Sequence, residues 1–171
     1  MLLNSSITGE INKEINKLSL LHKTIIAGVM EEILFRGFLF GLLFRRIKWG
    51  FLPASVPGAL LFASVHLYQG LNLSEATGIF IVTFLGALWF AWLFAEWNEN
   101  LRIPIFLHIL MNLSWVLFNI SDDALGNLMP NIFRIFSIAL TVIFTTWNCR
   151  KRGYFSISGK NLLINNQFDM I

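Results

Sequence analysis

Two adjacent carboxylates stand inside an otherwise apolar stretch of this sequence, GVMEEILFRGFLF, at Glu31 and Glu32, and Arg36 follows them. An ionised side chain inside hydrocarbon is costly unless it is paired, so these charges need a structural or chemical reason. Glu32 and Arg36 are four residues apart with the acid first, the favourable order for an ion pair along a helix. The spacing predicts that these two side chains neutralise each other, which leaves Glu31 in need of a partner elsewhere.

The apolar part of the chain offers two histidines as partners for Glu31, His66 in FASVH and His108 in HILMN. Asn112 shares a helix face with His108 by the i, i+4 rule. A carboxylate and an imidazole can together activate a water, and a second imidazole with an amide can stabilise an oxyanion. Because scattered polar groups would each lack partners in lipid, we expect Glu31, His66, His108 and Asn112 to converge on one buried polar site.

A divalent metal is an alternative use of the same side chains. Glu31, His66 and His108 are of the types that bind Zn²⁺, and such a site can keep a position open for water. The sequence has no H-E-x-x-H run, so the familiar metalloprotease helix is absent. The cofactor therefore stays open, with a metal-free mechanism favoured, and the residues alone indicate a hydrolytic or proton-transfer site.

The elements that must position these groups follow from composition. The 171 residues are 56% hydrophobic and only 13% charged, which is typical of a polytopic membrane protein. We predict an all-α membrane bundle of about five transmembrane helices plus an amino-terminal amphipathic helix. The expected spans are residues 24–44, a helix within 49–74, 76–95, a helix beginning near 104, and 128–149. In the second span, Pro53 and Pro57 are expected to delay the regular helix until the stretch GALLFASVHLY.

Three parts are expected along the chain: an amphipathic interfacial segment at 1–23, a membrane-embedded core at 24–150 with its motifs in 24–120, and a polar cytoplasmic tail at 151–171. The tail is expected to be poorly ordered from residue 156 onward, and the first residues lack the pattern of a cleaved secretory signal. If all five helices span, the clusters of basic residues fall on one side. The positive-inside rule then puts the carboxyl terminus in the cytoplasm and the amino-terminal segment outside. These basic residues are Arg45, Arg46, Lys48, Arg102, Arg150, Lys151 and Arg152.

Three motifs occur in a fixed order: EEILFR fits EExxxR, FASVH fits FxxxH and HILMN fits HxxxN. Over about residues 24–120 the chain resembles the CAAX-processing and bacteriocin-processing (CPBP, or Abi) intramembrane proteases, relatives of the type II CAAX prenyl endopeptidases. The resemblance implies that Glu31 is the water-activating acid with His66 as its partner. It further implies that His108 and Asn112 bind the oxyanion or complete a metal site. By the same resemblance, Glu32 and Arg36 are a structural ion pair, and Phe62 is a packing residue that orients its helix.

The resemblance implies an intramembrane endopeptidase that acts on membrane-associated or prenylated-type substrates. Its partners would be membrane lipid and a peptide or protein substrate. No nucleic-acid partner is expected, because the basic residues behind the net charge of +3 lie in short loops and flanks, where they suit lipid headgroups. A prokaryotic plasma membrane is expected. Family members usually carry further helices before the first motif, so a minimal or a truncated form is expected here.

Two other classes of function stay open. A catalytically silent membrane scaffold or bacteriocin self-immunity protein would keep the same polar network for helix packing. A small proton-coupled transporter would also use intramembrane Glu and His, but transporters are usually built on inverted repeats, and this sequence has no evident repeat.

Overall fold

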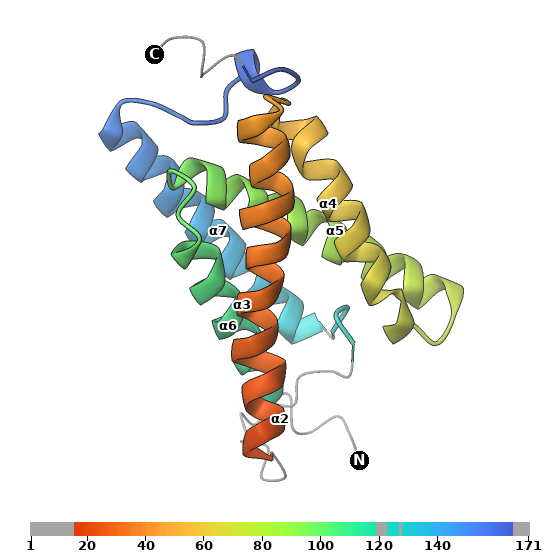
Figure 1. The fold of residues 1–171 in the computed structure, drawn as a ribbon. Helices are drawn as coiled ribbons and strands as arrows, with labels where there is room; N and C mark the ends of the chain where they lie inside the picture. The colour runs from red at the N-terminus through yellow and green to blue at the C-terminus, as the bar shows by residue number, and fades with distance from the viewer. Residues whose placement is uncertain (1–15, 119–122, 127, 166–171) are drawn as a thin grey trace.

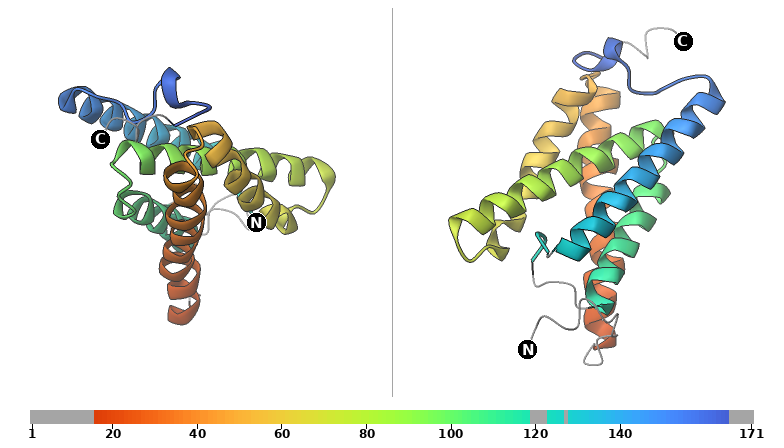
Figure 2. Two further views of the ribbon diagram at one scale, coloured as in Figure 1. Left: turned by 45° about the horizontal axis from the view of Figure 1, so that its top comes forward. Right: turned by 180° about the vertical axis from the view of Figure 1, so that it is seen from behind.

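The computed structural model describes residues 16–118, 123–126 and 128–165. Within these ranges the chain is helical, with one isolated antiparallel bridge between Trp49 and Ile164 instead of any strand. The predicted all-α fold is confirmed. A long helical run extends from one end of the molecule to the other. The loop between α4 and α5 lies on one side of this run, α5 crosses behind it, and α6 and most of α7 lie on the other side (Figures 1 and 2).

The first helical run covers residues 17–46 without a break. It consists of α2 (Lys17–Leu21), a π-helical segment His22–Ile26, α3 (Ala27–Glu32), and π-helical segments Ile33–Phe40 and Leu42–Arg46. The side chain of Asn16 caps its start by accepting a hydrogen bond from the Leu18 amide at 3.0 Å. Most of the predicted amphipathic segment at 1–23 lies outside the described residues.

The remaining helices are α4 (Phe51–His66), α5 (Leu73–Glu96), α6 (Arg102–Leu117) and α7 (Leu128–Arg152). Three helices in the described part are long and apolar enough to cross a membrane: Phe51–Gln69, Leu73–Glu96 and Pro130–Arg152. The shorter α6 has 16 residues, which is about 24 Å of helix against a hydrocarbon core of about 30 Å. Among the five predicted spans, the second, third and fifth are long and apolar enough to cross a membrane. The first lies within a helical run that is longer than any of these but carries Glu31, Glu32 and Arg36.

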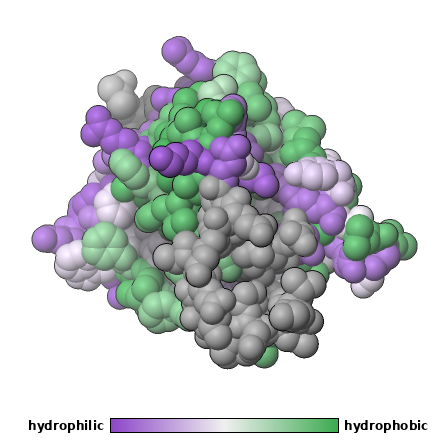
Figure 3. Space-filling model, turned by 90° about the horizontal axis from the view of Figure 1, so that it is seen from below, coloured by the Kyte–Doolittle hydropathy of each residue, from purple (hydrophilic) through white to green (hydrophobic). Residues whose placement is uncertain are grey.

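Exposed apolar side chains on these helices fit a lipid environment. On α7, for example, Phe133 is 68% and Ile135 is 66% exposed. Seen from below, hydrophobic residues reach the surface in many places between hydrophilic ones (Figure 3). Because water-soluble proteins rarely expose so many large apolar side chains together, these faces are suited to contact lipid.

The prediction for the start of α4 was wrong. The helix begins at Phe51, before both prolines, and Pro57 lies inside it. Pro53 falls in the first turn, where a helix needs no backbone donor, so its ring is tolerated there. Only Pro57 removes an internal hydrogen bond, and the helix continues through it.

The packed core lies where the first run, α4 and α5 meet. Its buried residues combine large rings with alanines that let α4 and α5 approach closely. These core residues are Phe40, Phe44, Phe51, Ala54, Ala91, Phe94 and Ala95. A second, smaller group nearer the motif residues contains Ala59, Phe62 and Ala87.

The expectation of a poorly ordered tail was wrong for residues 156–165. Glu96, which is fully buried, accepts hydrogen bonds from the amides of Ser156 at 2.9 Å and Ile157 at 3.0 Å. Farther along, the Asn165 side chain donates to the Phe44 carbonyl at 3.0 Å, and the Gly50 amide donates to the Leu163 carbonyl at 2.9 Å. The tail is held because a buried carboxylate at the end of α5 requires donors, and the tail backbone supplies them.

We predict that Glu96→Gln releases this tail. The amide has one acceptor oxygen where the carboxylate has two, so a buried backbone N–H of Ser156 or Ile157 loses its partner, at a cost of roughly 1–3 kcal/mol. Trypsin cleavage after Lys160 in lipid nanodiscs should then accelerate by about ten-fold or more. Glu75→Gln, at the start of α5, is the matched control, and equal cleavage rates in all three proteins would contradict the prediction.

Candidate active site

The ion pair predicted within the first run is present and fully enclosed. Arg36 Nη1 lies 3.0 Å from Glu32 Oε1, with side-chain exposures of 3% and 0%. Arg36 Nη2 donates to the Ala87 carbonyl on α5 at 3.3 Å. Its guanidinium carbon also lies 5.2 Å from the centre of the Phe62 ring and 5.1 Å from that of Phe90. A buried cation is tolerated here because a carboxylate, a carbonyl and two aromatic faces replace its water.

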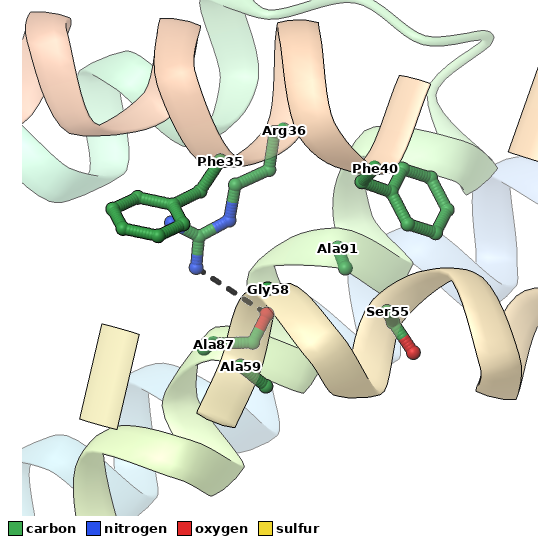
Figure 4. Close-up of a pocket in the computed structure, with 8 residues that line it drawn as sticks. All are labelled: Phe35, Arg36, Phe40, Ser55, Gly58, Ala59, Ala87 and Ala91. Carbon is green, nitrogen blue, oxygen red and sulfur yellow. Dashed lines mark hydrogen bonds between the residues drawn. The ribbon is translucent and has the colours of Figure 1, made fainter. Parts of the chain in front are cut away.

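Figure 4 shows the Arg36 guanidinium reaching from the first run toward Ala87, beside a cavity of about 10 Å³. That volume is close to the smallest that admits one water. The contact fixes the first run against α5. The cavity is lined by Phe35, Arg36, Phe40, Ser55, Gly58, Ala59, Ala87 and Ala91.

His108 lies between the two adjacent carboxylates. Its Nδ1 is 2.7 Å from Glu32 Oε1, and its Nε2 is 3.6 Å from Glu31 Oε2. Glu31 and Glu32 diverge by about 100° around the helix, yet both reach the same ring because the two nitrogens face different ways. The side chain of Glu31 is 32% exposed whereas that of Glu32 is buried. Of the two carboxylates, only Glu31 is open to an incoming molecule.

Close packing of α6 on the first run brings His108 to this position. Gly28, one turn before Glu32, is buried, and a Cβ atom added there would lie 3.1 Å from Ile109 Cγ1 and 3.3 Å from the Ile109 amide nitrogen. Ile109 follows His108 directly. The absence of a side chain at Gly28 therefore lets α6 approach closely enough for the imidazole to reach Glu32.

His66 and Phe62 form the α4 side of the site. His66 Nδ1 is 2.7 Å from the Phe62 carbonyl, which can only accept, so Nδ1 carries a proton and donates it to this carbonyl. The Phe62 ring lies 4.5 Å from the His66 ring and 6.4 Å from the His108 ring, centre to centre. Phe62 therefore packs between the two histidines and against Arg36.

The structure gathers most of the predicted residues but changes their pairing. The prediction that Glu32 and Arg36 neutralise each other alone was incomplete, because Glu32 also holds His108. Glu31 faces His108, and in the described part of the chain no hydrogen bond or ion pair joins it to His66. Asn112 follows His108 by one turn of α6, and its amide makes no hydrogen bond among the described residues.

Three contacts were missed at the sequence level: Glu32 with His108, Arg36 with Phe90, and Arg36 with the Ala87 carbonyl. No local pattern could have found them, since each joins helices far apart in the sequence.

The residues present do not form a ready metal site. Among the residues that the structure describes, no group of at least three His, Cys, Asp and Glu side chains could hold a metal ion. The set Glu31, His66 and His108 is therefore not gathered as ligands, since His66 lacks a contact with Glu31. We derive no step through a metal from this arrangement.

Comparison with known proteins places the site in a family. Residues 15–114, which include every candidate residue, match the family described as type II CAAX prenyl endopeptidase Rce1-like. The chain belongs to this family. The three apolar helices and the family together make it an integral membrane protein.

One curated relative is the protein named "Putative membrane peptidase YdiL" of Bacillus subtilis, which is 28% identical over 95 residues. The match covers 56% of this chain and 34% of that protein, so the shared part is about a third of the relative's length. No solved structure matches this chain.

We predict that Gly28→Val separates His108 from Glu32. The added side chain would overlap the Ile109 backbone, and overpacking of this kind costs about 1–3 kcal/mol. The midpoint of unfolding in mixed detergent should fall accordingly. Gly86→Val is the matched control, because a Cβ atom added at Gly86, also inside a helix, meets nothing within 4 Å. Equal losses of stability in both variants would contradict the role given to Gly28.

Proposed function

We propose that this protein is an intramembrane endopeptidase that hydrolyses peptide bonds of membrane-associated or prenylated-type substrates. The observation that carries the proposal is the position of Glu31, a partly exposed carboxylate 3.6 Å from His108 Nε2 at the centre of a buried polar cluster. Family membership supports the same reaction class.

Glu31 acts as the general base in this proposal. Its carboxylate accepts a proton from a water, and the water oxygen forms a bond to the carbonyl carbon of the scissile peptide. The carbonyl π bond opens to a tetrahedral oxyanion. The oxyanion re-forms the C=O bond as the C–N bond breaks, and the proton held by Glu31 passes to the leaving nitrogen. One carboxylic acid and one amine result, Glu31 is again a carboxylate, and the new acid then gives its proton to the amine or to water.

The imidazoles and the amide surround this reaction. The amide of Asn112, on the same face of α6 as His108, is the group proposed to donate a hydrogen bond to the developing oxyanion. His108, whose Nδ1 donates to Glu32, is proposed to accept a hydrogen bond from the attacking water at Nε2, beside Glu31. His66, whose Nδ1 is held by the Phe62 carbonyl, presents Nε2 and is proposed to orient the attacking water with Glu31. A substrate that closes the site would have to draw Glu31 and His66 toward the same water.

A cytoplasmic carboxyl terminus and an external amino-terminal segment are part of the proposal, in a prokaryotic plasma membrane with lipid and a membrane peptide as partners. Arg45 forms a 3.0 Å ion pair with Glu99 in the α5–α6 connection, and Arg152 at the end of α7 donates to Asn98 at 2.8 Å. The basic ends of the first run and of α7 thus both contact the α5–α6 connection, and basic residues on one side of the membrane are the pattern expected of a cytoplasmic face.

We predict that Glu31→Gln reduces cleavage by roughly 10²–10⁴-fold, because an amide cannot accept the proton of the water. The measurement is cleavage of a membrane-peptide library, with prenylated members included, by protein in nanodiscs. Glu75→Gln, outside the cluster, should cleave as the wild type does. If Glu31→Gln were as active as the wild type, or if the folded wild type cleaved nothing, the proposal would be wrong. The polar cluster would then hold the helices of a catalytically silent scaffold together.

We predict that prolonged dialysis against a chelator leaves the cleavage rate within about two-fold of its starting value, because the proposed base is a carboxylate that needs no Lewis acid to take a proton. The same library reports the rate. A loss of activity that Zn²⁺ restores would instead assign Glu31 or the histidines to a metal-dependent mechanism.

A further inference from the structure

We infer that Glu32 is a positioning residue that sets the tautomer and orientation of His108, in addition to pairing with Arg36. The inference rests on the proposed peptidase function for its kinetic consequence, while the geometry that supports it is independent of the reaction. A single oxygen, Glu32 Oε1, lies 3.0 Å from Arg36 Nη1 and 2.7 Å from His108 Nδ1.

The chemistry of the donors fixes which nitrogen of His108 carries a proton. A guanidinium only donates hydrogen bonds, and a carboxylate paired with it only accepts. His108 Nδ1 must therefore be the donor in its contact with Glu32. Nε2 is then the nitrogen directed at Glu31 Oε2, where the proposed reaction takes place.

The surroundings hold Glu32 in one position. Its side chain is completely buried, and Arg36 is anchored in turn by the Ala87 carbonyl. The His108 ring lies 5.5 Å from the Phe90 ring, centre to centre, so aromatic packing limits its tilt but leaves a half-turn about its own axis possible. The hydrogen bond to Glu32 is what selects one of the two ring orientations.

This arrangement assigns different tasks to the two adjacent glutamates. A carboxylate needed only for helix packing would be satisfied by Arg36 alone, one turn away on the same helix. Here the same oxygen also reaches a different helix and binds a ring whose other nitrogen faces the neighbouring carboxylate. Glu31 touches the reacting water, and Glu32 orients the group beside it, as carboxylates commonly orient metal-bound or catalytic imidazoles.

We expect Glu32→Gln to lower kcat by about 10–100-fold with KM changed by less than about three-fold, as removal of an orienting partner commonly does. Loss of the Arg36 partner could by itself damage the fold. The double variant Glu32→Gln/Arg36→Leu removes both charges together and leaves no unpaired ion. Positioning by Glu32 predicts that the double variant regains stability but stays slow, whereas a purely packing role predicts that kcat recovers with stability.

A spectroscopic readout tests the tautomer without any substrate. In protein labelled with ¹⁵N-histidine, Nδ1 of His108 should carry a proton with a strongly downfield resonance. This resonance should move upfield in Glu32→Gln, because a neutral amide oxygen accepts a weaker hydrogen bond than a carboxylate does. His66 is an internal control, because its Nδ1 is held by the Phe62 carbonyl and its signal should not change. The His108→Gln variant assigns the signal.

The inference is overturned if the His108 signal is unchanged in Glu32→Gln, or if kcat recovers in the double variant. It is supported if the signal moves upfield and kcat stays low. An active Glu31→Gln variant would refute the proposed function alone, since the NMR result for Glu32 does not depend on cleavage.

Discussion

The compensation of one buried carboxylate, Glu32, is the constraint on which the central arrangement depends. Its side chain is inaccessible, and the charge is compensated at Oε1, which accepts from two donors, while Oε2 accepts no hydrogen bond among the described residues. Arg36 comes from the next turn of the same helix, and His108 comes from α6. Because Arg36 also binds the Ala87 carbonyl and lies between the Phe62 and Phe90 rings, satisfying one charge fixes the first run, α4, α5 and α6 together.

Close helix approach makes these contacts possible. Hydrogen bonds between side chains of different helices need the backbones near one another, and in lipid small residues provide that approach. Gly28 does so between the first run and α6, and Ala59 and Ala87 do so between α4 and α5. The large rings of the neighbouring core, with Phe40 at its centre, then fill the remaining space. The hydrogen bonds between helices therefore depend on the close packing of the same helices.

The environment separates the roles of two residues that are identical in type and adjacent in sequence. Glu31 is partly exposed beside an imidazole, whereas Glu32 is enclosed and bonded to two donors. Such a difference in surroundings is how one protein assigns different tasks to two carboxylates. Both lie within the family match at 15–114, while the tail that Glu96 holds lies outside it. In the described part of the tail, the hydrogen bonds to other elements reach the end of α5, the end of the first run and the start of α4, and none of these bonds joins a motif residue.

The sequence by itself determined the helical membrane class, the ion pair of Glu32 with Arg36 and the inventory of polar groups. These depend on composition and on the spacing of residues within one helix, and the geometry of an α-helix is nearly the same in every protein. It also supported an expected start for α4 and a loose tail, and both were wrong, because a proline in a first turn costs little and a buried Glu96 recruits the tail backbone. Only the tertiary structure decided that His108, 76 residues from Glu32, binds it and faces Glu31. That choice depends on how closely α6 packs at Gly28, which is a property of two helices in contact and of neither helix alone.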